Sequence, residues 1–195
     1  MTIKHIKKLA LVLGSAVLLQ GCIAAVLGGA AVGGKIATDP RTTGTQIDDE
    51  TLEFKVYDAI TKDEQIKAEG RTVVVAYSGR VLLLGQMPNE MSKETATSLT
   101  KGVEGVKDNE VYNEMTIGTP ISLTQRTQDS WITTKVKSNM LVDSKVKTTD
   151  IKAITENATV YLMGNVTQDQ ATAAAKIASE VSGVKRVMKV FKYLD

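Results

Sequence analysis

The chain has 195 residues, with 24 lysines and arginines, 22 aspartates and glutamates, one histidine and one cysteine. His5 and Cys22 both lie near the N-terminus, so no residue after position 22 carries an imidazole or a thiol. This excludes from the rest of the chain a Cys/His zinc site, a Ser-His triad, a Cys-His nucleophile and a disulfide within one chain. We therefore predict a protein that is not an enzyme and holds no metal ion.

The first 21 residues have the pattern of a secretory signal peptide. Lysines in MTIKHIKK precede a short apolar segment, Leu9 to Leu19, which falls well below the roughly 20 residues that span a bilayer. Leu19-Gln20-Gly21-Cys22 resembles the lipobox of bacterial lipoproteins. The resemblance implies cleavage before Cys22, a diacylglycerol on its thiol and an acyl chain such as palmitate on its amino group, with no other cofactor. Because Ile23 rather than aspartate follows, the sorting rule of those lipoproteins implies the outer membrane.

The uncharged stretch from Leu9 to Gly34 leaves a second interpretation, an uncleaved membrane helix. Its many glycines favour a flexible tether over residues 22–45 instead. Removal of residues 1–21 takes three lysines away, so the mature chain has 21 basic and 22 acidic residues, a net charge of minus 1. The basic character of the full chain therefore belongs to the signal peptide.

An internal repeat divides the rest of the chain into two units, residues 46–118 and 119–195. TLEFKVYDAI (51–60) matches WITTKVKSNM (131–140) at an offset of 80 residues. AYSGRVLLLG (76–85) matches TENATVYLMG (155–164) at an offset of 79, and Gly105-Val106-Lys107 matches Gly183-Val184-Lys185 at 78. Three blocks in one order with nearly one offset predict two domains of the same fold.

Each unit begins with an amphipathic helix whose apolar residues recur every four positions. They are Leu52, Val56 and Ile60 in the first unit and Ile132, Val136 and Met140 in the second. The aspartates just before these residues, Asp48, Asp49 and Asp129, are candidate helix caps.

A hairpin, a second helix and a last strand follow in each unit, which predicts the order αββαβ twice. The hairpin strands are 73–76 and 81–84, then 151–155 and 159–163. Their turns run through Ser78-Gly79 and Asn157-Ala158, where a positive φ angle is tolerated best by glycine and asparagine. Thr167 and Gln170 have the spacing of a capping box for the second helix. The last strands are predicted over 110–117 and 186–194.

This order and its motifs resemble the BON domain of bacterial envelope proteins. The resemblance rests on Gly79-Arg80-Val81-Leu82-Leu83-Leu84-Gly85 and Thr159-Val160-Tyr161-Leu162-Met163-Gly164, and on Gly105-Val106 with Val111 and Gly183-Val184-Lys185-Arg186-Val187. Ala158 replaces the first hairpin glycine in the second unit, and two extra residues separate Val106 from Val111 in the first. The resemblance implies an α+β fold of two tandem BON domains, each with two helices on a three-stranded mixed sheet.

Together with the lipobox, the tandem BON units resemble envelope lipoproteins of Gram-negative bacteria. The resemblance implies a lipid-anchored protein of the inner leaflet of the outer membrane that faces the periplasm. It further implies binding of anionic phospholipid, phosphatidylglycerol or cardiolipin, through the second unit, and a role in outer membrane integrity at division sites.

The two copies differ on the exposed side of the first helix. On a helical wheel, Trp131, Thr134, Ser138 and Leu141 lie opposite the apolar residues, flanked by Lys135 and Lys137. The first unit has Thr51, Phe54, Asp58 and Thr61 at these positions, flanked by Lys55 and Tyr57. Residues 22–118 carry 10 basic and 15 acidic residues, net minus 5, whereas residues 119–195 carry 11 and 7, net plus 4.

These six residues are the candidate lipid site. An indole suits the boundary between water and lipid, so Trp131 and Leu141 would insert. Lys135 and Lys137 would supply charge, worth about 1 kcal/mol each at an anionic surface. Thr134 and Ser138 would hydrogen-bond to headgroups.

Other interpretations remain open at this point. Trp131 could fill the contact between the two units, and the basic balance could be ordinary solvated surface. The units could instead form a periplasmic scaffold that binds an envelope protein or an outer-membrane-assembly protein.

Other candidate sites are weak. Asp48-Asp49-Glu50 lacks the glycine and the spaced ligands of a calcium loop, and Glu110 with Glu114 forms a weak candidate acid–base pair. Nucleic acid is disfavoured because the lysines are dispersed and aromatics are few.

Overall fold

The computed structural model describes residues 43–107 and 109–194. The predicted signal peptide, Cys22 and nearly all of the predicted tether lie outside these residues. Helix α3 begins at Thr43, so the last three residues assigned to the tether are helical.

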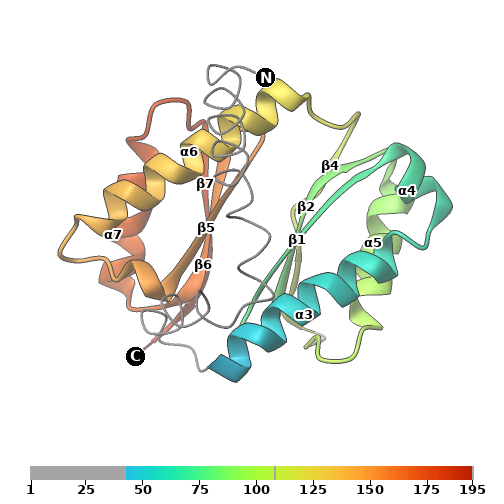
Figure 1. Ribbon diagram of the computed structural model, residues 1–195, viewed down its shortest axis with the longest axis horizontal. Helices are drawn as coiled ribbons and strands as arrows, with labels where there is room; N and C mark the ends of the chain where they lie inside the picture. The colour runs from blue at the N-terminus through green and yellow to red at the C-terminus, as the bar shows by residue number, and fades with distance from the viewer. Residues whose placement is uncertain (1–42, 108, 195) are drawn as a thin grey trace, which may run out of the picture. The chain divides into compact units, whose positions relative to one another are not determined.

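The first unit has two long helices on one face of a mixed sheet (Figure 1). Strand β2 pairs antiparallel with β1 and parallel with β3 and β4. Its elements are α3 (Thr43–Ile60), α4 (Glu64–Glu69), β1 (Arg71–Tyr77), β2 (Arg80–Met87), α5 (Glu90–Lys101), β3 (Val111–Asn113) and β4 (Thr116–Ile117).

The second unit repeats this arrangement, with β6 antiparallel to β5 and parallel to β7. Its elements are α6 (Leu123–Leu141), the 3-10 helix η2 (Thr148–Asp150), β5 (Ile151–Glu156), β6 (Thr159–Val166), α7 (Gln168–Ser179) and β7 (Arg186–Tyr193). Thr167 and Gln170 form the predicted capping box at the start of α7. The αββαβ order and the mixed sheets confirm the predicted fold class.

The last strand of the first unit differs from the prediction, because it is split into β3 and β4. The side chain of Asn113 accepts a hydrogen bond from the backbone N–H of Met115 (3.0 Å) and donates to the carbonyl of Lys93 (2.9 Å). Asn113 thus ties the strand to α5 and takes up a backbone donor, and the side chain of Met115 is buried. The strand therefore breaks here and resumes at Thr116.

The two hairpins turn as predicted, through residues with positive φ. Ser78 and Gly79 have φ of 52° and 77°, and Asn157 and Ala158 have φ of 48° and 61°. Positive φ at both central residues is the mark of a type I′ turn, whose twist suits a two-residue hairpin. Ala158 therefore occupies a backbone conformation that glycine would adopt at lower cost.

The last glycine of each hairpin motif is required by close packing of the neighbouring strand. A Cβ at Gly85 would lie 1.8 Å from the carbonyl oxygen of Arg71, and a Cβ at Gly164 would lie 2.2 Å from that of Asp150. No side chain fits at such distances. Glycine therefore lets β2 approach the first residue of β1, and lets β6 approach the residue just before β5.

Alternate residues of each strand belong to different cores. On one face of each sheet, Val56 of α3 packs with Val81 and Leu83, and Val136 of α6 packs with Val160 and Leu162. The predicted apolar residues of both first helices are buried. This confirms the predicted amphipathic faces.

The other faces of the two sheets pack against each other. Val75, Tyr77, Leu82 and Leu84 of the first unit form one buried cluster with Tyr161, Met163 and Val190 of the second. All residues of β2 are buried, because this strand has a helix layer on one side and the second sheet on the other. The two units therefore share a hydrophobic core.

Polar groups also join the two units. Arg80, only 2% exposed, donates hydrogen bonds to the carbonyls of Val190 (3.1 Å) and Gly164 (3.0 Å) and to Oδ1 of Asn165 (2.7 Å). Burial lowers the pKa of Arg80, yet an arginine stays charged at neutral pH.

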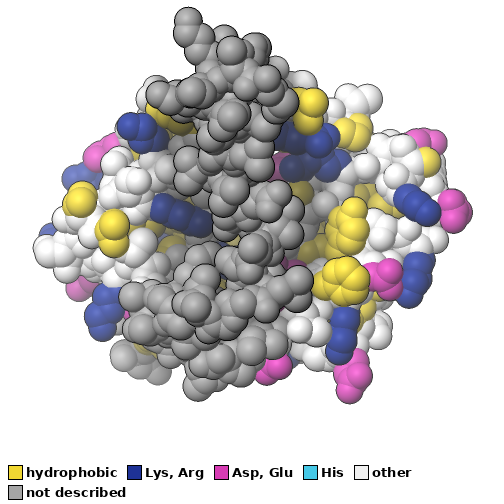
Figure 2. All heavy atoms as spheres, in the orientation of Figure 1, with side chains coloured by type: hydrophobic (Ala, Val, Ile, Leu, Met, Phe, Trp, Pro, Cys, Tyr) yellow, Lys and Arg dark blue, Asp and Glu magenta, His cyan; other side chains and the backbone are white. Residues whose placement is uncertain are grey.

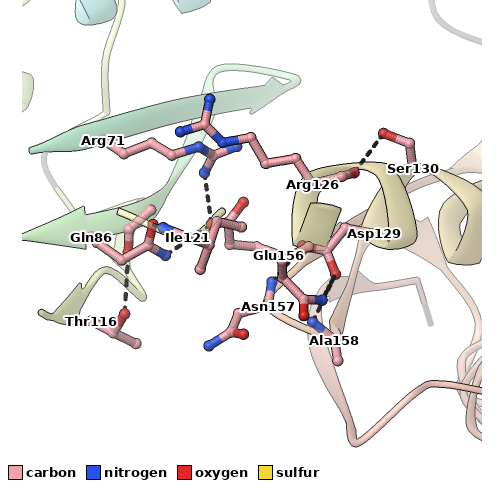
Figure 3. Close-up of polar contacts among 12 residues, drawn as sticks. Arg71, Gln86, Thr116, Ile121, Arg126, Asp129, Ser130, Glu156, Asn157 and Ala158 are labelled. Atoms are coloured by element: carbon pink, nitrogen blue, oxygen red, sulfur yellow. Dashed lines mark hydrogen bonds and ion pairs between the residues drawn. The ribbon is translucent and has the colours of Figure 1, made fainter. Parts of the chain in front are cut away.

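A second polar contact centres on the carboxylate of Glu156 (Figure 3). It accepts hydrogen bonds from Arg71 (2.6 Å) and from the side-chain amide of Gln86 (2.9 Å). These three groups are largely buried. The contact therefore stabilises the packing of the two sheets and also fixes their relative position.

Candidate functional site

Helix α6 carries all six residues of the predicted lipid site. Ser122 caps the helix by accepting a hydrogen bond from the backbone N–H of Gln125 (3.2 Å), and the helix ends at Leu141. It therefore begins eight residues before Trp131, well ahead of the predicted start. Ile132, Val136 and Met140 hold it on the sheet of the second unit.

Asp129 has a role that differs from the predicted one. It lies inside α6, is 3% exposed, and accepts hydrogen bonds from the backbone N–H groups of Asn157 (2.8 Å) and Ala158 (2.9 Å) (Figure 3). Gln125 donates a further hydrogen bond to it (3.0 Å). The prediction that Asp129 caps the helix is thus wrong, because its carboxylate instead caps the hairpin turn.

Asp49 plays the same part in the first unit. It lies within α3, is 3% exposed, and accepts hydrogen bonds from the backbone N–H groups of Ser78 (2.8 Å) and Gly79 (3.0 Å). The predicted capping role of Asp49 is therefore also wrong. The sequence contained an indication of this shared role, because an aspartate precedes the first buried apolar residue of the helix by three positions in both copies.

The six predicted residues are all exposed on α6. Trp131 is 51% and Leu141 is 73% exposed. Nζ of Lys135 lies 5.4 Å from the centroid of the Trp131 ring, a cation–π contact that holds the amine beside the indole. The hydroxyl of Thr134 donates to the carbonyl of Ser130 (2.9 Å), so it can offer a headgroup only its acceptor lone pairs.

Two exposed apolar residues of the same surface were not predicted. Leu123 is 75% exposed and Val142, directly after α6, is 85% exposed. Leu123 and Leu141 are five helical turns apart and so face the same way, at a separation of about 27 Å. We call Leu123, Trp131, Leu141 and Val142, with Lys135 and Lys137, the α6 surface.

Helix α6 itself has no exposed negative charge, and the next acidic residue, Asp143, is partly buried. The only acidic residue between Leu123 and Leu141 is Asp129, which is buried. Helix α3 is different, because Asp48, Glu50 and Asp58 are exposed there beside Phe54 (71%) and Tyr57 (47%). Figure 2 shows hydrophobic side chains over α3 with acidic and basic ones next to them.

The contact between the two units is built without Trp131. The cluster that joins the sheets consists of residues from the strands, and α6 lies on the opposite face of its sheet. Among the described residues, no group of three or more acidic, histidine or cysteine side chains is placed to hold a metal ion. No helix in residues 43–107 and 109–194 is both long enough and apolar enough to cross a membrane.

The model of the BON domain family matches the chain twice, over residues 48–119 and 128–195. The chain therefore belongs to the BON domain family. It is a tandem BON-domain outer membrane lipoprotein, and it is 66% identical over 195 residues to the outer membrane lipoprotein DolP of Haemophilus influenzae, with 100% of both chains covered.

Two further relatives are less similar in sequence. A 21 kDa hemolysin of Actinobacillus pleuropneumoniae is 49% identical over 157 residues, which cover 80% of each chain. The osmotically-inducible protein Y of Escherichia coli is 29% identical over 161 residues, which cover 82% of this chain and 80% of that one. The relatives are named as lipoprotein, hemolysin or inducible protein, and none is named as an enzyme.

Proposed function

We propose that this protein is a non-enzymatic lipoprotein that binds anionic phospholipid through the α6 surface. Acyl chains on Cys22 hold it at the inner leaflet of the outer membrane, facing the periplasm, and α6 adds a second contact with phosphatidylglycerol or cardiolipin. No cofactor beyond these acyl chains is needed. The observation that carries the proposal is the α6 surface itself, which combines exposed apolar side chains with lysines on a helix that has no exposed carboxylate.

The chemistry of the α6 surface suits a lipid headgroup region. Trp131 offers an apolar ring with one N–H group, which is the combination enriched at membrane interfaces. Lys135 and Lys137 each contribute about 1 kcal/mol near an anionic surface. Since two or three acyl chains already anchor a protein firmly, the function of α6 is to select the lipid and to orient the domain rather than to anchor the protein.

The test uses the mature chain, residues 22–195, with Cys22→Ser so that no acyl chain is present. Trp131 is the only tryptophan, so its fluorescence reports on this surface alone. Vesicles of phosphatidylglycerol should shift the emission to the blue, vesicles of phosphatidylcholine should not, and added salt should weaken the response because it screens exposed charges.

The first unit supplies matched control variants. Lys135→Gln should weaken vesicle binding about fivefold, and Lys55→Gln at the equivalent position of α3 should leave it unchanged. Leu141→Glu should weaken binding further, whereas Thr61→Glu should not. Equal effects of the two members of either pair, or no blue shift at low salt, would refute the proposal.

The proposed role of this contact is to support outer membrane integrity, at division sites as the resemblance to other tandem BON lipoproteins implies. Cells that carry Lys135→Gln with Leu141→Glu should then admit detergents that intact outer membranes exclude. The variant protein should still be present and acylated, since these side chains are exposed.

A second candidate function, a scaffold for an envelope or outer-membrane-assembly protein, is favoured by α3. Phe54 and Tyr57 are exposed beside acidic side chains, a surface that an anionic membrane would repel and that a protein with apolar and basic groups would accept. A photo-crosslinker at Phe54 should then capture a discrete envelope protein in cells, and a crosslinker at Lys55 on the neighbouring position serves as the comparison. Capture of lipid only would contradict the scaffold.

A further inference from the structure

A cavity of about 370 Å³ lies beside Trp131, between α6 and the loop that joins α7 to β7. Its buried lining is apolar, from Ile132 and Ala158, and its exposed lining is polar, from Gln128, Ser182 and Lys185. The volume lies at the lower end of the range of about 300–1,000 Å³ typical of small-molecule sites. The cavity thus has an apolar base, an indole wall and a polar mouth.

The first unit contains the equivalent cavity, of about 390 Å³, which serves as an internal comparison. By the offsets of the repeat, Gln128 corresponds to Asp48, Trp131 to Thr51 and Ser182 to Glu104. The second unit therefore replaces two carboxylates by groups that can donate hydrogen bonds, and it replaces a threonine by the tryptophan.

The two cavities have the same construction, so the difference between them is chemical. Asp49 and Asp129 each tie the first helix to the hairpin turn at the cavity. A Cβ at Gly105 would lie 3.6 Å from Cδ1 of Leu52, and one at Gly183 would lie 3.2 Å from Cδ1 of Ile132. A side chain would thus crowd the second cavity more than the first, and both glycines have a positive φ, 98° at Gly105 and 92° at Gly183.

The second cavity is suited to an anion. None of its lining residues is acidic, and the nearby oxygens of Asp129 already accept hydrogen bonds from Gln125, Asn157 and Ala158. Lys185 is held in place by its backbone N–H, which donates to the carbonyl of Ala158 (2.9 Å), while its side chain is exposed at the mouth. The first cavity is lined by Lys55 but also by the exposed carboxylates of Asp48 and Glu104, so it is less suited to the same ligand.

We propose that the second cavity receives the phosphodiester headgroup of an anionic membrane lipid. Lys185 pairs with the phosphate, Ser182 and Gln128 donate hydrogen bonds to the phosphate or to a headgroup hydroxyl, and the indole of Trp131 closes one side. Trp131 is half exposed, so it can contact the headgroup with one part of the ring and the start of the acyl chains with another. This proposal rests on the proposed function, because it names the part of the lipid that the α6 site recognises.

The test titrates the mature Cys22→Ser chain with glycerophosphoglycerol, the water-soluble headgroup of phosphatidylglycerol, and follows backbone amide shifts by NMR. A ligand of this size should bind with a Kd of about 1 mM. Shifts are expected at Ser182, Gly183 and Lys185 and at the indole N–H of Trp131. The equivalent amides Glu104 and Gly105 of the first unit should not move.

Matched variants make the comparison between the two cavities direct. Gln128→Asp with Ser182→Glu copies the acidic residues of the first unit and should weaken both the headgroup and phosphatidylglycerol vesicles by about fivefold for each added charge. Asp48→Gln with Glu104→Ser removes the acidic residues of the first cavity and should leave the headgroup-induced shifts at Ser182, Gly183 and Lys185 unchanged. All four side chains are exposed, and an unchanged circular dichroism spectrum will show that the variants fold.

The outcomes separate this proposal from the proposed function. If vesicles bind but glycerophosphoglycerol moves none of the cavity amides, the cavity proposal is overturned and lipid binding by α6 stands. If inorganic phosphate moves them as strongly and the acidic variant leaves vesicle binding unchanged, the cavity is a free-phosphate site and the proposal is overturned too. If vesicles do not bind, the proposed function itself fails.

Discussion

Replacement of Asp129 by asparagine should destabilise the second unit although the side chain keeps its shape. The carboxylate accepts two backbone hydrogen bonds from the hairpin turn, at 2.8 and 2.9 Å, and is 3% exposed. Asparagine can accept one of them, and its NH₂ group would then face the other N–H donor. A hydrogen bond to a charged group contributes about 1.5–3 kcal/mol, and a buried donor left unpaired adds to the cost. We expect a loss of about 3 kcal/mol in the free energy of unfolding.

Urea denaturation of the mature Cys22→Ser chain measures this loss as a lower midpoint at an unchanged slope. Ser130→Ala is the control, because its hydroxyl donates to the carbonyl of Arg126 on the exposed side of the same helix and its loss should cost less than about 0.5 kcal/mol. A loss from Asp129→Asn no larger than that of Ser130→Ala would show that the carboxylate does not stabilise the turn.

Three further predictions concern the strands. Burial raises the pKa of Tyr161 to about 12, so between about pH 10, where the unfolded tyrosine ionises, and pH 12 only the unfolded state loses its proton. The free energy of unfolding, measured by urea titration, should therefore fall by about 2 kcal/mol over this range, and Tyr161→Phe should remove that part of the fall. Gly164→Ala would place Cβ 2.2 Å from the carbonyl oxygen of Asp150 and should lower the free energy of unfolding by about 3 kcal/mol, with a wild-type value refuting the close approach. Arg80→Met removes three hydrogen bonds from the buried side chain to the second unit and should cost about 3 kcal/mol, measured in the same way. A loss below about 0.5 kcal/mol would contradict its role in joining the units.

The fold was largely predictable because the chain contains its own comparison. A repeat with one offset identified the units, and four-residue spacing identified the buried helix faces. The start of α6 was not predicted, since Asp129 looks like a cap in the sequence and only the hairpin, some 28 residues later, reveals its partner. The break between β3 and β4 likewise depends on a side-chain contact between Asn113 and α5 that no periodicity records.

The packing of the two sheets against each other could have been predicted from one pattern in the sequence. Val81-Leu82-Leu83-Leu84 is apolar on both faces of β2, which is typical of a strand covered on both sides. Arg80 gave no such signal, because a buried arginine and an exposed one look the same in a sequence. At the site, Trp131 and Leu141 followed from the comparison of the copies, but Leu123 lies outside the matched segments and was missed.

The arrangement of the two sheets explains why the first helices are free to diverge. Each sheet has its helices on one face and the other sheet on the opposite face, so the hydrophobic contact between the units uses strands alone, and Glu53 of α3 adds an ion pair with Lys152 of β5. The outward side of α6 then takes no part in either core, and changes there cost no packing energy. The carboxylate of Asp129 also fixes α6 to the hairpin. Trp131 is therefore presented on a helix that need not move to meet a membrane, and vesicle binding should leave the circular dichroism spectrum of the protein unchanged.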